Sequence, residues 1–384
     1  MTSKFKIAVL PGDGIGDEVI SQATKIIKSI DYLDKKLELH QYQCGGRYYL
    51  ETGREWSTEA EEFCKTEADA ILLGAVGAMD KSGNSVRLSD ENLAGYNVVL
   101  GLRFDLDLYA NVRPVKLFEG VPTPLANKSP KDIDMTIIRE NTEGLYAPIR
   151  GRLTRGGDDE IAIDTRVITR KGAERVIRYA FHEAQRRRGA PFDGNRRVTC
   201  VDKSNLLAGC QLFRKVYNEI ATDFPDIETD YAYVDAWTQW VVKKPEFYDV
   251  VVAPNEFGDI MTDLGGAIQG GLGMAPAGNI GESHAVFEPV HGSAPKHAGK
   301  NTVNPIAAIL AASMMLEWLG RKHSEPKFIE IAEIIERSIE DILREGKIRT
   351  YDLCIDKWSK VTPSSTEKMG DEIRKIIEMK LRES

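Results

Sequence analysis

NEFGDIMTDLGGAIQGGLGMAPAGNIG, residues 255–281, directly follows the apolar run YDVVVAP at residues 248–254. The apolar run predicts a buried strand. The quoted stretch begins as a helix in which Asp259 and Asp263 lie four positions apart. Four positions are about one helical turn, so the two carboxylates share one face of that helix. Like charges so close destabilise a helix unless a cation or a favourable dipole compensates them.

A third carboxylate, Asp235 in YVDAWTQ, lies shortly before the same strand. Three carboxylates, with water or substrate oxygens, suit a hard divalent cation such as Mg²⁺ or Mn²⁺, which prefers octahedral oxygen coordination. The alternative is that Asp259 and Asp263 are N-terminal helix charges that the dipole favours. The spacing alone supports both interpretations equally.

Composition narrows the class of protein. The chain has 384 residues, 42% apolar and 29% charged, which is ordinary for a globular protein long enough for two domains. The formal net charge of −8 argues against nucleic-acid binding, so an anionic ligand would need locally clustered cations. The five cysteines are scattered without metal-ligand spacing, as expected for reduced thiols. Because we find neither a signal-peptide pattern nor a membrane-spanning apolar stretch, we expect a cytoplasmic protein.

Apolar strand-like runs alternate with helix-like stretches along the chain, which predicts α/β layers around a largely parallel sheet. The strand-like runs are KIAVL (6–10), ADAILLGAVG (68–77), DIDMTIIREN (132–141) and YDVVVAPN (248–255). EIAIDTRVIT (160–169) instead alternates like an exposed or pairing strand. The helical stretch after it ends in Arg186, Arg187 and Arg188, which we interpret as a solvated helix end.

PGDGIG, residues 11–16, follows a strand and opens a helix, as a nucleotide-binding loop would. Its glycines at 12, 14 and 16 give GxGxG, which is not the GxGxxG that brings a helix N-terminus close to a pyrophosphate. We therefore interpret this segment as a tight structural turn.

Arginines form a second candidate group. Arg103 and Arg113 lie in GLRFDLDLYANVRP, and Arg139 lies in TIIREN. Guanidinium groups bind carboxylates bidentately, so three in one pocket would suit a polycarboxylate, whereas each one alone is typical of a surface. The loop FEPVHGSAPKHAGKNTVNP, residues 287–305, is rich in small residues and could wrap a planar ring and a ribose, or be simply a long connection.

These motifs resemble the β-decarboxylating dehydrogenases, the family of isopropylmalate, isocitrate, homoisocitrate and D-malate/tartrate dehydrogenases. The resemblance extends from KIAVLPGDGIG to the C-terminal region and is sharpest in the stretch quoted first and in FEPVHGSAP. It implies an isopropylmalate-dehydrogenase-like two-domain α/β fold whose cofactor site is not of the Rossmann type. The implied domains are discontinuous: a large cofactor-binding domain of residues 1–108 plus 270–384, and a small dimerisation and substrate domain of residues 109–269. An arm near residues 150–169 would clasp the second subunit of a homodimer.

The resemblance also implies roles for individual residues. Tyr146 in ENTEGLY and Lys203 in VDKSN match the family's acid–base pair. The partner subunit would supply Lys203 and the metal-binding Asp235. The matching metal ligands are Asp235, Asp259 and Asp263, and the residues matching those that bind the malate are Arg103, Arg113, Arg139 and Asp235.

The members of the family differ in the substituent on C3 of the malate that they bind. The resemblance implies that residues just before Arg103 contact this substituent. Isocitrate enzymes carry a serine there, which residues 96–102 of this chain lack. Homoisocitrate enzymes place an arginine where this chain has Leu100, and a further carboxylate against Val99 and Leu100 would lack a donor. Val99 and Leu100 form an apolar pair, as in isopropylmalate enzymes, although plain helix packing would also explain them.

Leu206, three residues after Lys203, supplies another apolar position typical of isopropylmalate enzymes. D-malate/tartrate enzymes share the apolar pair but carry glycine at position 206, and residues 117–144 also resemble that subgroup. The expected substrate is 3-isopropylmalate, converted to 4-methyl-2-oxopentanoate and CO₂ in leucine biosynthesis. The alternative is D-malate or tartrate, followed by isocitrate or homoisocitrate.

The resemblance implies that NAD(P)⁺ binds the loop at 287–305. NAD-using members have an aspartate where this chain has Lys296, and NADP-using members have a basic residue followed by Tyr or His, as in Lys296-His297. A cation without an acidic competitor favours the 2′-phosphate, so we expect use of NADP⁺ or of both nucleotides. The expected cofactor-binding residues are Glu288, His291, Gly292, Ser293, Ala294, Pro295, Lys296, His297, Asn304 and Tyr351.

Two rival classes remain. A metal-dependent phosphohydrolase could also combine aspartates, Mg²⁺ and arginines, but KIAVLPGDGIGDE lacks the DxD-type motif expected after its first strand. A non-catalytic regulatory subunit is the second rival, although Tyr146, Lys203 and the three aspartates are all intact.

Overall fold

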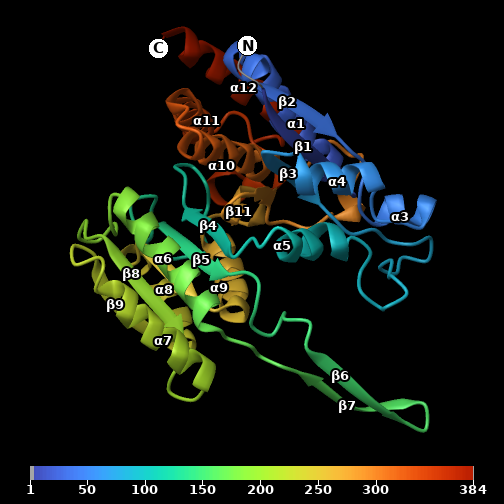
Figure 1. The fold of residues 1–384 in the computed structure, drawn as a ribbon. Helices are drawn as coiled ribbons and strands as arrows, with labels where there is room; N and C mark the ends of the chain where they lie inside the picture. Colours follow the sequence, from blue (N-terminus) through green and yellow to red (C-terminus); the bar gives the residue numbers. More distant parts are fainter. Residues whose placement is uncertain (1–3, 384) are drawn as a thin grey trace. The chain divides into compact units, whose positions relative to one another are not determined.

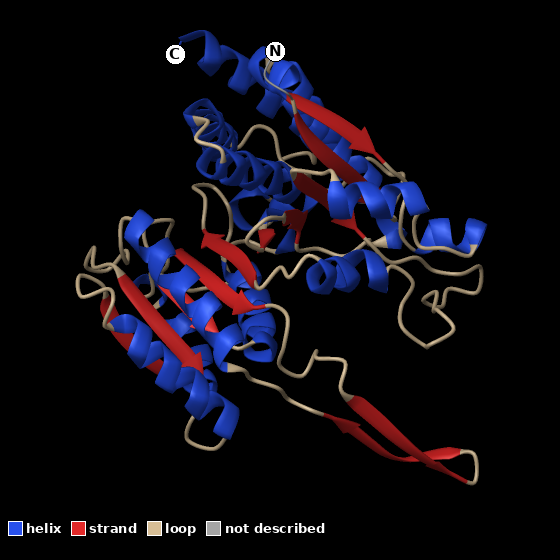
Figure 2. Cartoon of the chain, in the orientation of Figure 1, coloured by secondary structure: helices blue, strands red, loops and turns tan. Residues whose placement is uncertain are grey.

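The computed structural model describes residues 4–383, and the chain forms two compact units (Figure 1). Unit 1 consists of the residues through Asp107, Leu117–Ala126 and the residues from Gly266 onward, and unit 2 consists of Leu108–Lys116 and Asn127–Gly265. Residues 117–126, expected in the small domain, pack in unit 1, where the Thr123 hydroxyl donates to the Ile268 carbonyl at 2.7 Å. Each unit combines strands with covering helices (Figure 2), which confirms the predicted α/β class.

The strands of unit 1 lie in the order β2-β1-β3-β12-β11, and only β11 is antiparallel to its neighbour in this series. The predicted apolar runs at 6–10 and 68–77 become β1 and β3, with Ile7 opposite Ala70. Both strands are buried, because helices cover both faces of a parallel sheet. The bounds are β1 Phe5–Gly12, β2 Leu37–Gln41, β3 Ala70–Ala75, β11 Pro276–Ile280 and β12 Ala285–Pro289.

Helix α10 is the central helix of unit 1 and packs against β12, α1 and α11. The sequence of this helix is largely apolar, and most of its residues are buried. The helices of unit 1 are α1 Gly16–Ser29, α2 Asp31–Lys36, α3 Gly46–Thr52, α4 Thr58–Thr66, α5 Leu102–Asp105, α10 Ile306–Lys322, α11 Pro326–Glu345 and α12 Thr366–Glu383. The short turns are the π-helical η1 Asn97–Gly101 and the 3₁₀ turns η3 Leu272–Met274, η4 Pro295–His297, η5 Tyr351–Leu353 and η6 Asp356–Trp358.

The PGDGIG segment is a tight turn that brings two stretches of backbone together. Gly14 has φ +60°, and a Cβ there would lie 2.0 Å from the Ser293 carbonyl oxygen. The Ile15 amide donates to that same oxygen at 2.9 Å. Glycine is required at position 14 because the left-handed backbone and the close approach both exclude a side chain. The turn therefore fixes the position of the backbone around Ser293.

The strands of unit 2 lie in the order β4-β5-β10-β8-β9, with β4 antiparallel to β5 and the other pairs parallel. The predicted runs at 132–141 and 248–255 become the neighbours β5 and β10. The bounds are β4 Ala110–Lys116, β5 Asp134–Glu140, β8 Arg197–Asp202, β9 Glu228–Tyr233 and β10 Val250–Ala253. The helices are α6 Arg170–Arg186, α7 Ala208–Ala221, α8 Val234–Lys243 and α9 Asn255–Ile268, with the 3₁₀ turn η2 Pro245–Phe247.

Arg187, expected as part of a solvated helix end, is instead held inside unit 2. Its Nε lies 2.7 Å from a carboxylate oxygen of the fully buried Asp249, and its Nη2 lies 2.8 Å from Asp134. A buried carboxylate requires a paired cation, and Arg187 supplies it. The interpretation of Arg187 as solvated is therefore wrong.

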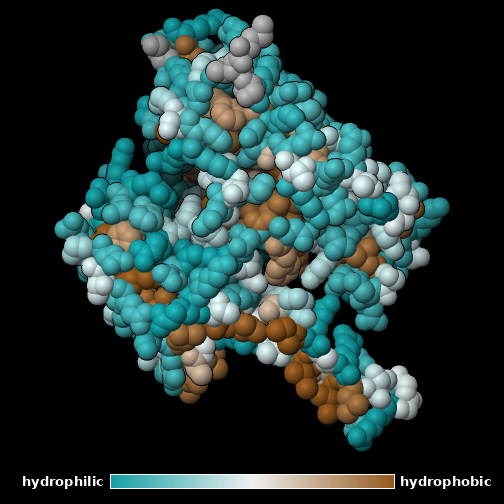
Figure 3. Space-filling model, viewed as in Figure 1, coloured by the Kyte–Doolittle hydropathy of each residue, from teal (hydrophilic) through white to brown (hydrophobic). Residues whose placement is uncertain are grey.

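The segment predicted as an arm forms a hairpin of β6 Arg150–Arg155 and β7 Asp158–Asp164, which projects from the rest of unit 2 (Figure 1). All residues of these two strands are exposed. Figure 3 shows hydrophobic residues, in brown, on the hairpin. Of the residues in its two strands, Leu153, Ile161 and Ile163 are 42%, 47% and 59% exposed. Within residues 4–383 no helix has the length and apolar character needed to cross a bilayer.

Candidate active site

The two aspartates of the opening motif lie on α9, as predicted, and each meets an arginine from the strands of unit 2. Arg139 on β5 forms an ion pair with Asp259, and Nη1 of Arg113 on β4 lies 3.5 Å from Oδ1 of Asp263. The antiparallel register places Arg113 opposite Ile137, so the two arginines are diagonal neighbours on one face. Their cationic groups offset the repulsion between the two carboxylates.

Arg139 is held by more than its ion pair. The side-chain oxygen of Asn255 accepts hydrogen bonds from Nε and Nη2 of Arg139 at 2.9 and 2.8 Å. A Cβ at Gly258 would lie 2.6 Å from Cγ of Arg139, so glycine lets α9 approach this side chain closely. Because Asn255, Gly258 and Asp259 all contact it, the arginine has a fixed orientation.

Tyr146 joins the same cluster. Its hydroxyl donates to Oδ2 of Asp259 at 2.8 Å, and its ring centre lies 5.5 Å from the guanidinium carbon of Arg139. Burial, the hydrogen bond to Asp259 and the charge of Asp259 together raise the pKa of Tyr146 above its ordinary value. The phenol therefore keeps its proton at neutral pH, as a proton donor must.

Lys203 and Asp235 form a second pair in unit 2. The Lys203 ammonium lies 2.5 Å from Oδ1 of Asp235 and 5.8 Å from the centre of the Tyr233 ring. The hydrogen bond from Lys203 lowers the pKa of the Asp235 carboxyl. Leu206, expected as an apolar contact to the substrate, is 71% exposed.

Asp235 does not join Asp259 and Asp263 within one chain. No group of three His, Cys, Asp or Glu side chains in the described part of the chain is arranged to hold a metal ion. The pair on α9 nevertheless fits a hard cation, because both groups are oxygen donors and both are partly exposed. A third ligand would have to come from elsewhere, as the expected contribution of a partner subunit would provide.

Arg103 lies in unit 1 and does not point freely into solvent. It is 9% exposed, and its Nη2 lies 3.3 Å from Oε1 of Glu288, which also accepts from Asn279 at 2.8 Å. Val99 and Leu100 are half-buried on the η1 turn just before it. Unit 1 therefore brings Arg103 together with Glu288, one of the expected cofactor-binding residues.

The expected cofactor loop of unit 1 is ordered around Ser293, which is 8% exposed and tied to Ile15 as described above. Ala294 has φ +37°, an unusual conformation for a residue with a side chain. Burial lowers the pKa of His291, whose Nδ1 lies 3.1 Å from the Gly292 carbonyl oxygen, so its imidazole is neutral at pH 7.

His297 and Tyr351 stack in parallel, with their rings offset, at the end of this loop. Their ring centroids lie 5.6 Å apart with an interplanar angle of 5°. Lys296 and Pro295 beside them are exposed, and Asn304 donates to Asp352 at 3.0 Å. The structure thus places a cation, an imidazole and a phenol side by side, although 54 positions separate residue 297 from residue 351.

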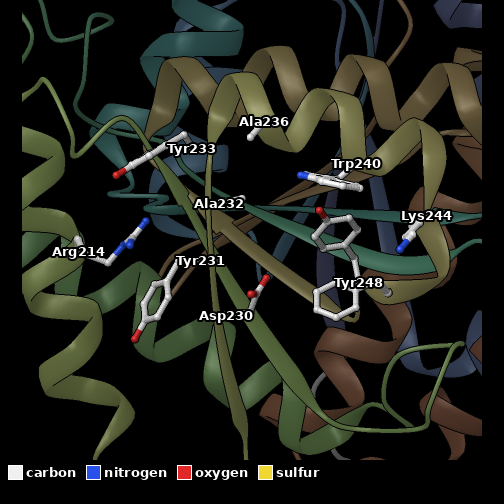
Figure 4. Close-up of a pocket in the computed structure, with 10 residues that line it drawn as sticks. Arg214, Asp230, Tyr231, Ala232, Tyr233, Ala236, Trp240, Lys244 and Tyr248 are labelled. Atoms are coloured by element: carbon white, nitrogen blue, oxygen red, sulfur yellow. The ribbon is translucent and has the colours of Figure 1, made fainter.

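A cavity of about 540 Å³ lies beside β9 and α8 in unit 2 (Figure 4). Its aromatic walls already face cations of the protein, because Arg214 lies 4.3 Å from the Tyr231 ring centre and Lys244 lies 5.7 Å from that of Trp240. None of the expected site residues lines it. The candidate site is therefore the α9 cluster and not this cavity.

Sequence reasoning missed Asn255 and Asn279, the two amides that orient Arg139 and Glu288. Asn255 is 1% exposed and stands at the first position of α9. The usable signal was an amide directly after an apolar strand at the head of the aspartate-bearing helix.

Comparison with known proteins agrees with this geometry. The family described as isocitrate/isopropylmalate dehydrogenase matches residues 6–373. The chain therefore belongs to the isocitrate/isopropylmalate dehydrogenase family, as the motifs predicted.

Individual relatives refine this similarity. The 3-isopropylmalate dehydrogenase of Thermobifida fusca is 40% identical over 97% of this chain and 97% of its own length. That of Corynebacterium efficiens is 42% identical over 91% and 97%. Among solved structures, isocitrate dehydrogenase from Methylococcus capsulatus has a TM-score of 0.81 and 35% identity, covering 97% of this chain and 99% of that one.

The cluster makes a prediction about Tyr146 in the metal-free protein. Replacing Asp259→Asn removes a negative charge that raises the pKa of the phenol, so this pKa should fall towards its ordinary value of 10.0. It should stay somewhat above that value because burial remains. Ultraviolet difference absorbance during alkaline titration measures the midpoint, and Tyr146→Phe identifies the signal. An unchanged midpoint in Asp259→Asn would contradict the assigned contact.

Proposed function

We propose that this chain is a cytoplasmic, homodimeric enzyme that oxidises and decarboxylates 3-isopropylmalate to 4-methyl-2-oxopentanoate in leucine biosynthesis. The observation that carries the proposal is the similarity, over nearly the full length, to relatives named 3-isopropylmalate dehydrogenase. The apolar pair Val99 and Leu100 before Arg103 supports this substrate over one with a further carboxylate.

The metal site would consist of Asp259, Asp263 and the partner's Asp235, holding Mg²⁺ or Mn²⁺. When bound, the cation supplies a Lewis acid beside the substrate's oxygens and stabilises the negative charge left by the loss of CO₂. Arg139 and Arg113 now face the two carboxylates of α9. With a cation bound to those carboxylates, the guanidinium groups would be able to bind the carboxylates of the substrate.

The proton transfers would be divided between Lys203 and Tyr146. Lys203, reaching into the site of the partner subunit, would take the proton of the C2 hydroxyl while the C2 hydride passes to the nicotinamide. Tyr146 would then protonate C3 after decarboxylation. Its raised pKa supports this role because the phenol arrives protonated.

Substrate selection would rest on an apolar wall of Val99 and Leu100, completed by the partner's Leu206. Small apolar contacts discriminate by about 1–3 kcal/mol, so the wall would favour an isopropyl group over hydrogen without excluding smaller malates. D-malate or tartrate is therefore the principal alternative. Isocitrate also needs testing, because a solved isocitrate dehydrogenase is 35% identical to this chain.

Nucleotide reduction with Mg²⁺ and each candidate acid tests the proposal. We expect kcat/KM for 3-isopropylmalate to exceed that for D-malate, L-tartrate and isocitrate by about tenfold or more, following the discrimination of small apolar groups. A tenfold preference for D-malate or tartrate would overturn the role of the apolar wall but not that of the α9 cluster.

Hybrid dimers test the sharing of active sites. Tyr146→Phe and Lys203→Met should each lower kcat by about 10²-fold or more, the scale of acid–base catalysis. Mixing the two inactive proteins under subunit exchange should restore about a quarter of wild-type activity, because about half of the dimers are hybrids with one intact site. Mixtures that stay inactive despite demonstrated exchange would show that both groups act within one subunit.

Lys296 tests the choice of nucleotide. We propose that Lys296, His297 and Tyr351 contact the 2′-phosphate of NADP⁺, which the stacking of His297 on Tyr351 beside an exposed lysine supports. Lys296→Asp should shift the NADP⁺/NAD⁺ ratio of kcat/KM towards NAD⁺ by about tenfold or more, since it replaces attraction by repulsion of a phosphate. The exposed Lys300→Asp is the control, and an unchanged ratio in Lys296→Asp would refute the assignment.

A further inference from the structure

The η1 turn, which carries the apolar pair, is π-helical and not α-helical. It covers Asn97–Gly101 and passes directly into α5, which carries Arg103. A π-helical turn contains an extra residue, so the side chains of Val99 and Leu100 are rotated relative to Arg103 from their α-helical positions. Such turns are uncommon and frequently occur at functional sites.

Glu55, more than 40 residues earlier, binds the start of the turn. Its Oε1 accepts the Gly95 amide at 2.5 Å and the Asn97 amide at 3.3 Å, and its Oε2 accepts the Asn97 side-chain amide at 2.5 Å. Glu55 is buried, with only 7% of its surface exposed. Three N–H donors thus converge on one carboxylate, an acceptor-only group when ionised.

Glu55 is itself held in place by hydrogen bonds of the neighbouring backbone. The Glu55 carbonyl accepts the Gly45 amide at 2.7 Å. The neighbouring amides of Gly46 and Arg47 are bound by the carboxylate of Asp13 at 2.7 and 2.8 Å. The other end of the turn is fixed as well, because Arg103 is paired with Glu288.

Packing alone does not hold the turn at its outer side. Glu55, Tyr96, Asn97 and Gly101 all line one hollow of about 640 Å³. Val98 is fully buried, but Val99 and Leu100 are only half-buried. Without the carboxylate, the start of the turn has room to shift and to move its two apolar side chains.

We propose that Glu55 is a positioning residue for substrate selectivity, which holds Val99 and Leu100 in place through the η1 turn. Its negative charge at the start of that turn also disfavours substrates that bring a further carboxylate. This inference rests on the proposed function, because it requires the C3 substituent of the substrate to contact the η1 turn.

Two variants separate the contact from the charge. Glu55→Ala removes the acceptors, and we expect the preference for 3-isopropylmalate over D-malate, as a ratio of kcat/KM, to fall by about tenfold, within the range that small apolar contacts provide. Glu55→Gln removes the charge, keeps an acceptor for the Gly95 amide, and replaces the Asn97 side-chain bond by one in which its own NH2 donates to Oδ1 of a flipped Asn97. It should largely retain that preference while kcat/KM for isocitrate rises by about threefold or more relative to D-malate.

Controls keep the test decisive. Glu51→Ala and Glu51→Gln change an exposed glutamate on the neighbouring α3 and should leave every ratio unchanged. Should Glu55→Ala fail to fold, Asn97→Ala removes one of the same hydrogen bonds at an exposed residue and should shift the ratio in the same direction.

The outcomes are distinguishable from failure of the proposed function. A wild-type enzyme that does not prefer 3-isopropylmalate would refute the proposed substrate. A wild type with that preference, and Glu55 variants that lose activity on all substrates by one common factor, would show that Glu55 is merely structural. Unchanged ratios in folded Glu55→Ala and Asn97→Ala would overturn the inference.

Discussion

The side chain of Arg139 is 3% exposed, and a charge so far from water costs several kcal/mol unless it is paired and hydrogen-bonded. Asn255 and Asp259, the first and fifth residues of α9, meet that requirement. The helix must therefore begin directly after its strand and approach the neighbouring strand closely, which Gly258 permits. The same contact aligns Tyr146, so one electrostatic constraint determines both the packing of α9 and the arrangement of the candidate site.

Periodic features of the sequence predicted much of this arrangement. The apolar runs became neighbouring strands, and the spacing of Asp259 and Asp263 placed them on one helix face, as observed. Arg187 was mispredicted because a helix-end arginine is usually solvated, whereas its partners come from distant parts of the chain: Asp134 begins β5, and Asp249 directly precedes β10. Its environment depends on the order of strands in the sheet, which periodicity does not specify. The roles of the site residues remain predictions that the experiments above address.

Local sequence was also insufficient for the η1 turn. NVVLG is compatible with an ordinary α-helix, yet it forms a π-helical turn whose first amide is bound by the carboxylate of Glu55, distant in sequence. The stacking of His297 on Tyr351 has the same character, since neither residue signals the other along the chain. In both places, contacts between residues far apart in the sequence determine the local geometry of a segment whose helical or loop character the sequence had indicated.

The hairpin of β6 and β7 has a consequence for the stability of the whole protein. Two-stranded ribbons are marginal in water, and this one exposes Leu153, Ile161 and Ile163. For the hairpin to be ordered, these apolar side chains must therefore be buried against a second surface. If that surface is another copy of the chain, folding is linked to association, and the thermal midpoint rises with protein concentration. Dilution alone would then loosen the hairpin before it affects the buried sheet.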